Sequence, residues 1–229
     1  MRNVSNLILL AAGIAVTVSA GPVYDIVAGF SNASNPNGVW SYSYGNGTNP
    51  VLFSQPVTNQ GQQEWYNGGG QPDSITILQN ISGGTITGST VSIPNGYLNL
   101  DPEEFTVAVE FTAPSAGSYT INGNFLGNDT NELSHPVQIM DNGTSIYSNT
   151  IAAFQQAGAF NLTESLNIGD TIEFLVSSPV PGSAWTNLST GLQGTITSNS
   201  AVPEPGTGGL MAIALGLAGA AFLYRGRLG

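Results

Sequence analysis

The sequence predicts an all-β protein of the jelly-roll β-sandwich class. From residue 23 to residue 199, short runs rich in Val, Ile, Thr, Tyr and Phe alternate with Gly, Asn, Pro and Ser. The runs recur at the regular spacing that is typical of a sandwich or a jelly roll. No stretch of ten residues keeps a helical apolar period, and the most helix-like fragment, 151–160, is too short to outweigh a loop.

The predicted strands are listed here in chain order: 23–30, 38–45, 50–57, 74–81, 85–93, 96–100, 104–112, 117–126, 136–140, 144–150, 160–168, 170–177 and 191–198. Loop dipeptides such as Asn95-Gly96 and Gly169-Asp170, and the triplet 141–143, mark turns between them. The segment 113–117 is expected to connect two strands as a hairpin. Within 104–112, the apolar residues alternate, so one strand face is predicted to enter the core.

Charge is distributed unevenly along the 229 residues. The basic residues are Arg2, Arg225 and Arg227, whereas all acidic residues except Glu204 lie between 21 and 201. This acidic middle excludes nucleic acid as an expected partner, because phosphate binding needs basic side chains. Anionic glycans are disfavoured for the same reason unless a cation bridges. The chain has no cysteine, so it has no disulfide or thiolate metal site.

The N-terminus predicts a secretory signal peptide over residues 1–20. Arg2 precedes an apolar run at 7–18, and Val18-Ser19-Ala20 forms a small-x-small site before Gly21. We expect cleavage between Ala20 and Gly21. An uncleaved anchor is the alternative, and it would leave the following domain on the same side of the membrane.

The C-terminus predicts one transmembrane helix over residues 206–224. These residues carry no charge, and at about 1.5 Å per residue they span roughly 28 Å, close to the hydrocarbon thickness of a bilayer. Arg225 and Arg227 follow directly, which keeps the C-terminus in the cytoplasm and the preceding domain outside it. An ordinary single-span anchor after a proline-rich stalk is the alternative interpretation.

The run Pro203-Glu204-Pro205, the apolar segment and the short basic end together resemble the PEP-CTERM sorting signal of bacterial exported proteins. The resemblance implies that an exosortase-type membrane enzyme processes the tail and passes the protein to the cell surface or the exopolysaccharide matrix. The chain is thus expected to divide into a signal peptide (1–20), a β-sandwich ectodomain (21–200) and a sorting signal (201–229).

Three stretches of the middle region, 31–45, 111–125 and 169–174, are similar to ectodomains attached to such tails. This resemblance implies a jelly-roll sandwich like those of carbohydrate-binding modules and galactose-binding-like domains.

Catalytic chemistry has few candidates in this sequence. His135 is the sole histidine, lysine is absent, and 68–70 is glycine-rich without the lysine of a phosphate loop. The densest carboxylate cluster is Asp101, Glu103 and Glu104, but neighbouring strand residues point to opposite faces. We therefore expect a protein without enzymatic activity.

Aromatic side chains are the stronger candidates for a binding site. Trp40, Tyr42 and Tyr44 lie two residues apart, so they share one strand face and could stack on successive sugar units. Trp65 and Tyr66 lie in a segment rich in Gly and Gln. The alternative for the Trp40 to Tyr44 stripe is the core between two sheets, which large aromatics often fill.

Calcium is a second candidate ligand. It prefers oxygen atoms from loop carboxylates and amides, which the segments around Asp129, Glu132 and Asp141 supply, although neither segment has EF-hand spacing. No other cofactor is expected.

The sequence thus favours an exported structural or adhesive protein of the exopolysaccharide or biofilm matrix that contacts neutral glycans through exposed aromatics. The alternative is a secreted polysaccharide-active enzyme that depends on carboxylates. A third interpretation, binding to ice or a crystal surface, needs a flat array of threonines. Residues 85–87 and 195–197 are too few to provide one.

Overall fold

The computed structural model describes residues 18–19, 21–46, 49–59, 61–67, 75–180, 187–199 and 202–203. The chain divides into two compact units, Pro22–Ser200 and a unit formed by the two ends, Met1–Gly21 with Ala201–Gly229. In the terminal unit, β1 (Val18–Ser19) pairs antiparallel with β18 (Val202–Pro203). The predicted helix 206–224, most of the signal peptide and its cleavage residue Ala20 lie outside the described residues.

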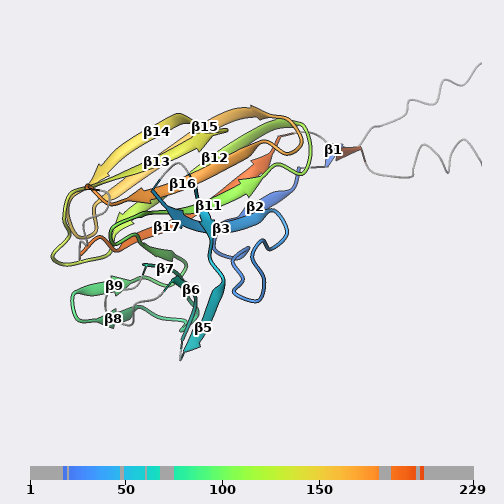
Figure 1. Ribbon diagram of the computed structural model, residues 1–229. Coiled ribbons are helices and arrows are strands. Elements are labelled where there is room, and N and C mark those ends of the chain that lie inside the picture. The colour runs from blue at the N-terminus through green and yellow to red at the C-terminus, as the bar shows by residue number, and fades with distance from the viewer. Residues whose placement is uncertain are drawn as a thin grey trace, which may run out of the picture. The chain divides into compact units, whose positions relative to one another are not determined.

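The central unit is an all-β sandwich, as predicted, and Figure 1 shows its strands stacked in layers. One sheet has eight strands, in the order β15 (Ala157–Leu166), β12 (Gly117–Gly127), β17 (Thr190–Ser198), β10 (Leu98–Asp101), β7 (Ile75–Asn80), β6 (Gln62–Asn67) and β5 (Gln55–Asn59), with β2 (Val23–Asp25) also paired to β17. The other has six, in the order β14 (Thr144–Ile151), β13 (His135–Asp141), β16 (Thr171–Ser177), β11 (Thr106–Thr112), β3 (Trp40–Gly45) and β4 (Val51–Leu52). A separate hairpin joins β8 (Ile86–Gly88) to β9 (Val91–Ile93). Among the described residues, no helix is long and apolar enough to cross a membrane.

Alternation along the strands builds the core between the two large sheets. In β11, Val107, Val109 and Phe111 are fully buried, as the period-two pattern predicted. Rings from opposite sheets meet there: the Phe111 and Tyr119 centroids are 5.9 Å apart, and those of Phe160 and Phe174 are 5.7 Å apart. Tilted and edge-on ring pairs of this kind add stability beyond their buried area.

The turn predicted at 141–143 closes the β13–β14 hairpin. Asn142 and Gly143 have φ angles of 47° and 76°, the left-handed values that a two-residue hairpin turn requires at both positions. Asn and Gly adopt this conformation at the lowest steric cost, so the local sequence fixes the strand register here.

The strand predictions differ from the structure in several places. The predicted run 23–30 is a strand only over Val23–Asp25, and 50–57 covers two strands, β4 and β5, that belong to different sheets. The predicted run 85–93 is a hairpin, β8 and β9, rather than one strand. β15 begins at Ala157, within the segment 151–160, for which the sequence favours a loop. β6, at Gln62–Asn67, was not predicted, because its polar composition resembles a loop.

Candidate functional site

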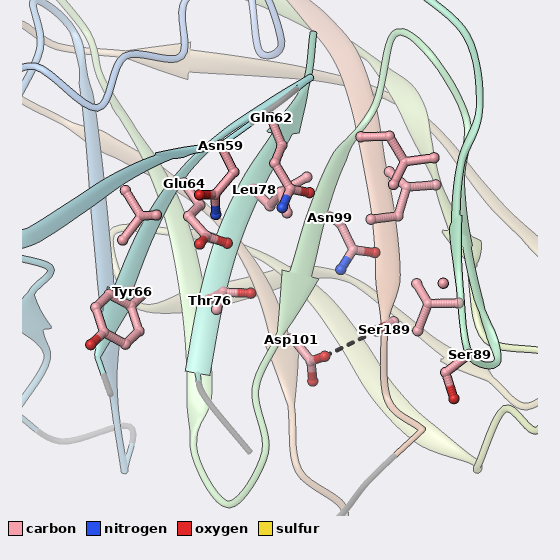
Figure 2. Close-up of a pocket in the computed structure, with 15 residues that line it drawn as sticks. Asn59, Gln62, Glu64, Tyr66, Thr76, Leu78, Ser89, Asn99, Asp101 and Ser189 are labelled. Atoms are coloured by element: carbon pink, nitrogen blue, oxygen red, sulfur yellow. Dashed lines mark hydrogen bonds between the residues drawn. The ribbon is translucent and has the colours of Figure 1, made fainter. Parts of the chain in front are cut away.

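The outer face of the eight-stranded sheet carries a groove of about 710 Å³ over β5, β6, β7 and β10. Side chains at alternate positions of these strands form its floor, and the β8–β9 hairpin and Ser189 contribute the rest of its lining. Figure 2 shows these side chains projecting into one space, with Tyr66 on one side and Ser89 on the other. The polar lining residues are Asn59, Gln62, Glu64, Tyr66, Thr76, Ser89, Asn99, Asp101 and Ser189.

The strand pleat explains why this floor is polar. Trp65, Ile77 and Leu100 point to the opposite face of the same strands and are buried in the core. Their sequence neighbours must therefore point outward into the groove. The registers place Tyr66 beside Thr76 and Thr76 beside Asp101, so one row of polar groups crosses three strands.

Two carboxyl groups line the groove, and burial raises the pKa of both. Glu64 is 5% exposed, and desolvation is the cause of its raised pKa. Burial also raises the pKa of Asp101 to about 6, although Ser189 opposes this shift by donating a 3.0 Å hydrogen bond to its Oδ2 atom. Asp101 is therefore largely uncharged at mildly acid pH and becomes negative as the pH rises above about 6.

Hydrogen bonds at several points hold the β8–β9 hairpin, which forms one wall of the groove. The side-chain amide of Asn80 donates hydrogen bonds to the carbonyl oxygens of Gly84 (2.7 Å) and Ile93 (2.9 Å). On the other side, the Thr90 hydroxyl donates to Asp129 Oδ2 (2.9 Å), and Ser92 N donates to Asn128 O (2.8 Å). These bonds fix the wall before any ligand arrives, which lowers the ordering cost of binding.

Asn128 also supports the floor of the groove. It is fully buried and donates from Nδ2 to Asn99 Oδ1 at 2.8 Å. It lies against Gly191 of β17, where an added Cβ would come within 3.1 Å of the Asn128 amide nitrogen. The missing side chain at 191 thus leaves room for the amide that donates to Asn99 on the groove floor.

The structure corrects most of the predicted glycan platform. Trp40 (4% exposed) and Tyr42 (0%) share one face as expected, but that face is the core, so their rings offer no surface to a sugar. Trp65 is also buried, at 4% exposed, and its indole Nε1 donates to Ser31 O at 2.8 Å. Tyr44 is half-buried and packs against Phe53, with ring centroids 4.8 Å apart.

Tyr66 is the one predicted aromatic that lines the groove. Among the side-chain amides near these aromatics in the sequence, Gln62 also lines the groove. Asn35 has a structural role instead, because its side chain bonds the backbone of Tyr42 and Phe53. Asp101 lines the groove too, and it belongs to the carboxylate cluster that the sequence singles out. Glu64 was not predicted because β6 resembles a loop in sequence; the alternation of Gln62, Glu64 and Tyr66 with Trp65 was the available signal.

The predicted calcium ligands do not form one centre. Asp129 and Glu132 belong to a local turn in which Asp129 N donates to Glu132 Oε2 at 2.9 Å, whereas Asp141 ends β13 beside Asn142. In the described part of the chain, no group of three or more His, Asp or Glu residues is arranged to hold a metal ion. Calcium binding by fewer ligands stays a prediction.

His135 is buried and occupied by structural contacts. Its Nε2 lies 2.6 Å from Thr190 Oγ1, its Nδ1 lies 2.7 Å from Leu133 O, and its pKa is lowered by burial. Glu132 Oε1 lies 3.6 Å from the same Nδ1 atom. These contacts link the β12–β13 connection to β17 and leave the imidazole inaccessible from the groove.

Solved structures similar to this chain include three family 35 carbohydrate-binding modules. One from an environmental isolate is 17% identical, covers 53% of this chain and 91% of its own, and has a TM-score of 0.33. One from Clostridium thermocellum is 17% identical, with coverage of 62% and 98% and a TM-score of 0.29. One from Paenibacillus barcinonensis is 14% identical, with coverage of 79% and 100% and a TM-score of 0.34.

Comparison with curated proteins found no match. The model of the PEP-CTERM protein-sorting motif matches residues 201–227. This match confirms the resemblance seen in the Pro203-Glu204-Pro205 run and its following segment. The chain therefore carries a PEP-CTERM sorting motif at its C-terminal end.

Proposed function

We propose that the protein is exported, processed at its sorting motif and retained at the cell surface or in the exopolysaccharide matrix. There its β-sandwich, residues 21–200, acts as a structural or adhesive element that binds neutral glycan chains in the groove of the eight-stranded sheet. The observation that carries this proposal is the groove floor, on which amides, hydroxyls and one tyrosine are held by the pleat of four strands.

The chemistry of the lining fits an uncharged sugar. Asn59, Gln62 and Asn99 offer amide donors and acceptors, which match the hydroxyl groups of a glycan. Tyr66 adds an aromatic ring with a hydroxyl tip, which packs on apolar sugar faces. Glu64 and Asp101, together with the acidic middle of the chain, disfavour anionic glycans.

The binding test is isothermal titration calorimetry, in which neutral oligosaccharides are titrated into the purified protein. We expect Gln62→Ala and Tyr66→Ala each to raise Kd about tenfold, which corresponds to about 1.4 kcal/mol. Gln138→Ala and Tyr24→Ala, which change the same residue types outside the groove, serve as controls. Equal affinity in the groove variants and the controls would contradict binding in the groove.

The sorting part of the proposal is tested by cell fractionation with mass spectrometry. The wild-type protein is expected outside the cytoplasm in a form shortened near residues 203–205. Glu204→Ala should accumulate as uncut protein in the membrane fraction, because the processing enzyme is expected to read this motif. Soluble full-length protein in the cytosol would rule out export.

An enzyme is the second candidate, favoured by the two carboxyl groups with raised pKa values in one groove. Glu64 pairs with Leu78, and Asp101 pairs with Thr76 two residues away, which puts their Cα atoms roughly 12 Å apart at ordinary sheet spacing. Glycosidases need carboxyl groups separated by about 5 to 9.5 Å, and two side chains on Cα atoms roughly 12 Å apart reach that separation only if they lean toward each other. Release of reducing sugar by the wild type and its loss in both Glu64→Gln and Asp101→Asn would establish this activity; no release would exclude it for the glycans tested.

A further inference from the structure

The outer face of β15, β12 and β17 carries a regular array of short polar side chains beyond the groove. The registers align Thr163, Thr120 and Thr197 in one row across the three strands. The next row is Asn161, Asn122 and Thr195. We call these six residues the Thr/Asn face. Ordinary sheet geometry spaces neighbours about 4.8 Å apart along a row and places the rows about 7 Å apart.

The Thr/Asn face is open to solvent. Thr163, Asn161 and Asn122 are exposed, and the other three members are half-buried beside their neighbours. The intervening residues, including Ile121 and Ile196, point to the opposite side and are fully buried in the core. The array therefore stands on a rigid sheet, and its short side chains lose little rotamer freedom when a partner covers them.

No member of the Thr/Asn face is ionisable, although the domain contains almost all acidic residues of the chain and neither Lys nor Arg. The carboxylate at its margin is the exposed Asp25 of β2, which pairs with Thr195 at the end of the second row. A partner that covers this face meets hydroxyls and amides without having to desolvate a charge. An anionic surface gains nothing here, because the six residues offer no positive charge and Asp25 beside Thr195 repels it. The charge pattern thus fits an uncharged, hydroxyl-rich surface.

A shallow hollow of about 570 Å³ adjoins the array and adds further amides. Asn122 and Asn161 line it together with Asn124 and Gln193, which belong to the next row across β12 and β17. Gln193 Nε2 donates to Asn124 Oδ1, so the two amides hold each other in place. The Thr120 hydroxyl is likewise held by Asn199, at 3.0 Å from its Nδ2. Polar groups of fixed orientation are suited to a ligand of regular structure.

The groove and the Thr/Asn face lie on the same side of the same sheet. Asn99, on the groove floor, pairs with Gly191, and Gly191 pairs with Leu126 of β12, whose neighbour at Asn124 belongs to the hollow. The β8–β9 hairpin walls only the groove end. The sheet therefore offers a walled groove that fits a single glycan chain and an open face that fits a flat surface.

We propose that the Thr/Asn face is a second glycan-binding surface, which takes the flat face of an ordered, uncharged polysaccharide rather than a single soluble chain. Its rows of hydroxyls and amides hydrogen-bond to sugar hydroxyls on several parallel chains at once, and many weak contacts on one rigid surface add up to retention. This inference rests on the proposed glycan-binding function, but on a different part of the sheet.

The test is retention of the full-length protein in detergent on microcrystalline cellulose, with beads of alginate, an anionic polysaccharide, as the comparison. The wild type should stay on cellulose and not on alginate.

Thr163→Glu should weaken cellulose retention about tenfold, because it buries an unpaired charge at the contact. Asn161→Glu, also exposed on β15, is the second variant if Thr163→Glu lowers thermal stability. Thr150→Glu places the same change on β14, the edge strand of the other sheet, and should leave retention unchanged.

Failure of this inference and of the groove proposal are distinguishable. Tyr66→Ala should weaken soluble oligosaccharide binding and keep cellulose retention, whereas Thr163→Glu should weaken cellulose retention and keep oligosaccharide binding. Absence of wild-type retention on cellulose, or equal loss in Thr163→Glu and Thr150→Glu, would overturn the second surface and leave the groove intact. Inhibition of ice growth by a wild type that does not bind cellulose would assign the same array to ice instead, and would also overturn the inference.

Discussion

At the scale of single residues, a buried cluster at the ends of β12 and β17 decides how stability depends on pH. Burial raises the pKa of Glu132 to about 8, with the nearby carboxylates of Asp129 and Asp101 acting in the same direction and backbone hydrogen bonds from Asp129 and Asn128 opposing the shift. Its Oε1 atom is buried without a hydrogen-bond partner among the described residues. The protonated form of Glu132 is therefore favoured in the folded protein at neutral pH.

This cluster predicts that the folded protein loses stability as pH rises. A carboxyl group whose folded pKa lies above its unfolded value stabilises fully below the unfolded value, here 4.5, and this contribution is lost as pH rises through about 8. His135 has the opposite effect, because its lowered pKa costs stability only below about 6.5. The window from pH 6.5 to 8 thus reports mainly on Glu132.

The check is thermal unfolding of wild type and Glu132→Gln between pH 6.5 and 8. The wild-type Tm is expected to fall across this window, and the variant's Tm is expected to fall less, because glutamine carries no proton to lose. Glu164→Gln, a half-buried glutamate of β15, is the matched control. Parallel curves for wild type and Glu132→Gln would show that Glu132 is ionised in the folded protein.

At the scale of elements, the β8–β9 hairpin controls the groove, and Asn80 is its main anchor. Asn80→Ala removes the bonds to Gly84 and Ile93, and we expect it to cost about 1 to 3 kcal/mol of unfolding free energy, the range for a buried polar bond left unpaired. Backbone amides of β8 and β9 should exchange with deuterium faster, and neutral glycans should bind more weakly.

Hydrogen exchange with mass spectrometry measures this loosening directly. Asn149→Ala changes the same residue type on β14, where its amide contacts the Tyr147 hydroxyl, and should leave β8–β9 exchange unchanged. If Asn80→Ala speeds exchange equally across the whole sandwich, the β8–β9 hairpin does not open independently of the sheets, and the prediction is wrong.

The elements also show what the sequence alone could predict. Strands with alternating apolar residues, such as β11, and the Asn142-Gly143 turn were predictable because their signals are local. β6 was not, because five of its six residues are polar or amphipathic and only Trp65 reaches the core. The rings of Trp40 and Tyr42 were placed on one face correctly, but periodicity does not say which face meets the other sheet.

The Thr/Asn face illustrates the same limit over longer distances. Thr120 pairs with Thr163 and Thr197, which lie far away in the sequence. Each strand shows only two or three short polar residues, and neither sequence run of threonines predicted an array. Cross-strand register creates the array, and register depends on the core contacts of all three strands.

At the scale of the whole molecule, the net charge is −11, and within residues 21–200 it is more one-sided still, because that range has 13 Asp and Glu residues and no Lys or Arg to pair with them. Mutual repulsion of these groups destabilises the compact state. Added NaCl should therefore raise Tm at pH 8, because the screening length shortens from about 30 Å at 0.01 M to about 8 Å at 0.15 M.

The same salt series at pH 4 is the control, since many carboxyl groups are then protonated and the increase in Tm should be smaller. A Tm that falls with salt at pH 8 would mean that attractive charge pairs outweigh repulsion.

The central claim is that an exported sandwich binds neutral glycans on the outer face of its eight-stranded sheet. Hydrogen exchange of the protein with and without a bound neutral oligosaccharide tests it most directly, because it locates the ligand without relying on a variant. We predict slower exchange in β6, β7, β10 and the β8–β9 hairpin, with no change in β13 and β14. Protection confined to β13, β14 or β16 would place the ligand on the other sheet and contradict the claim.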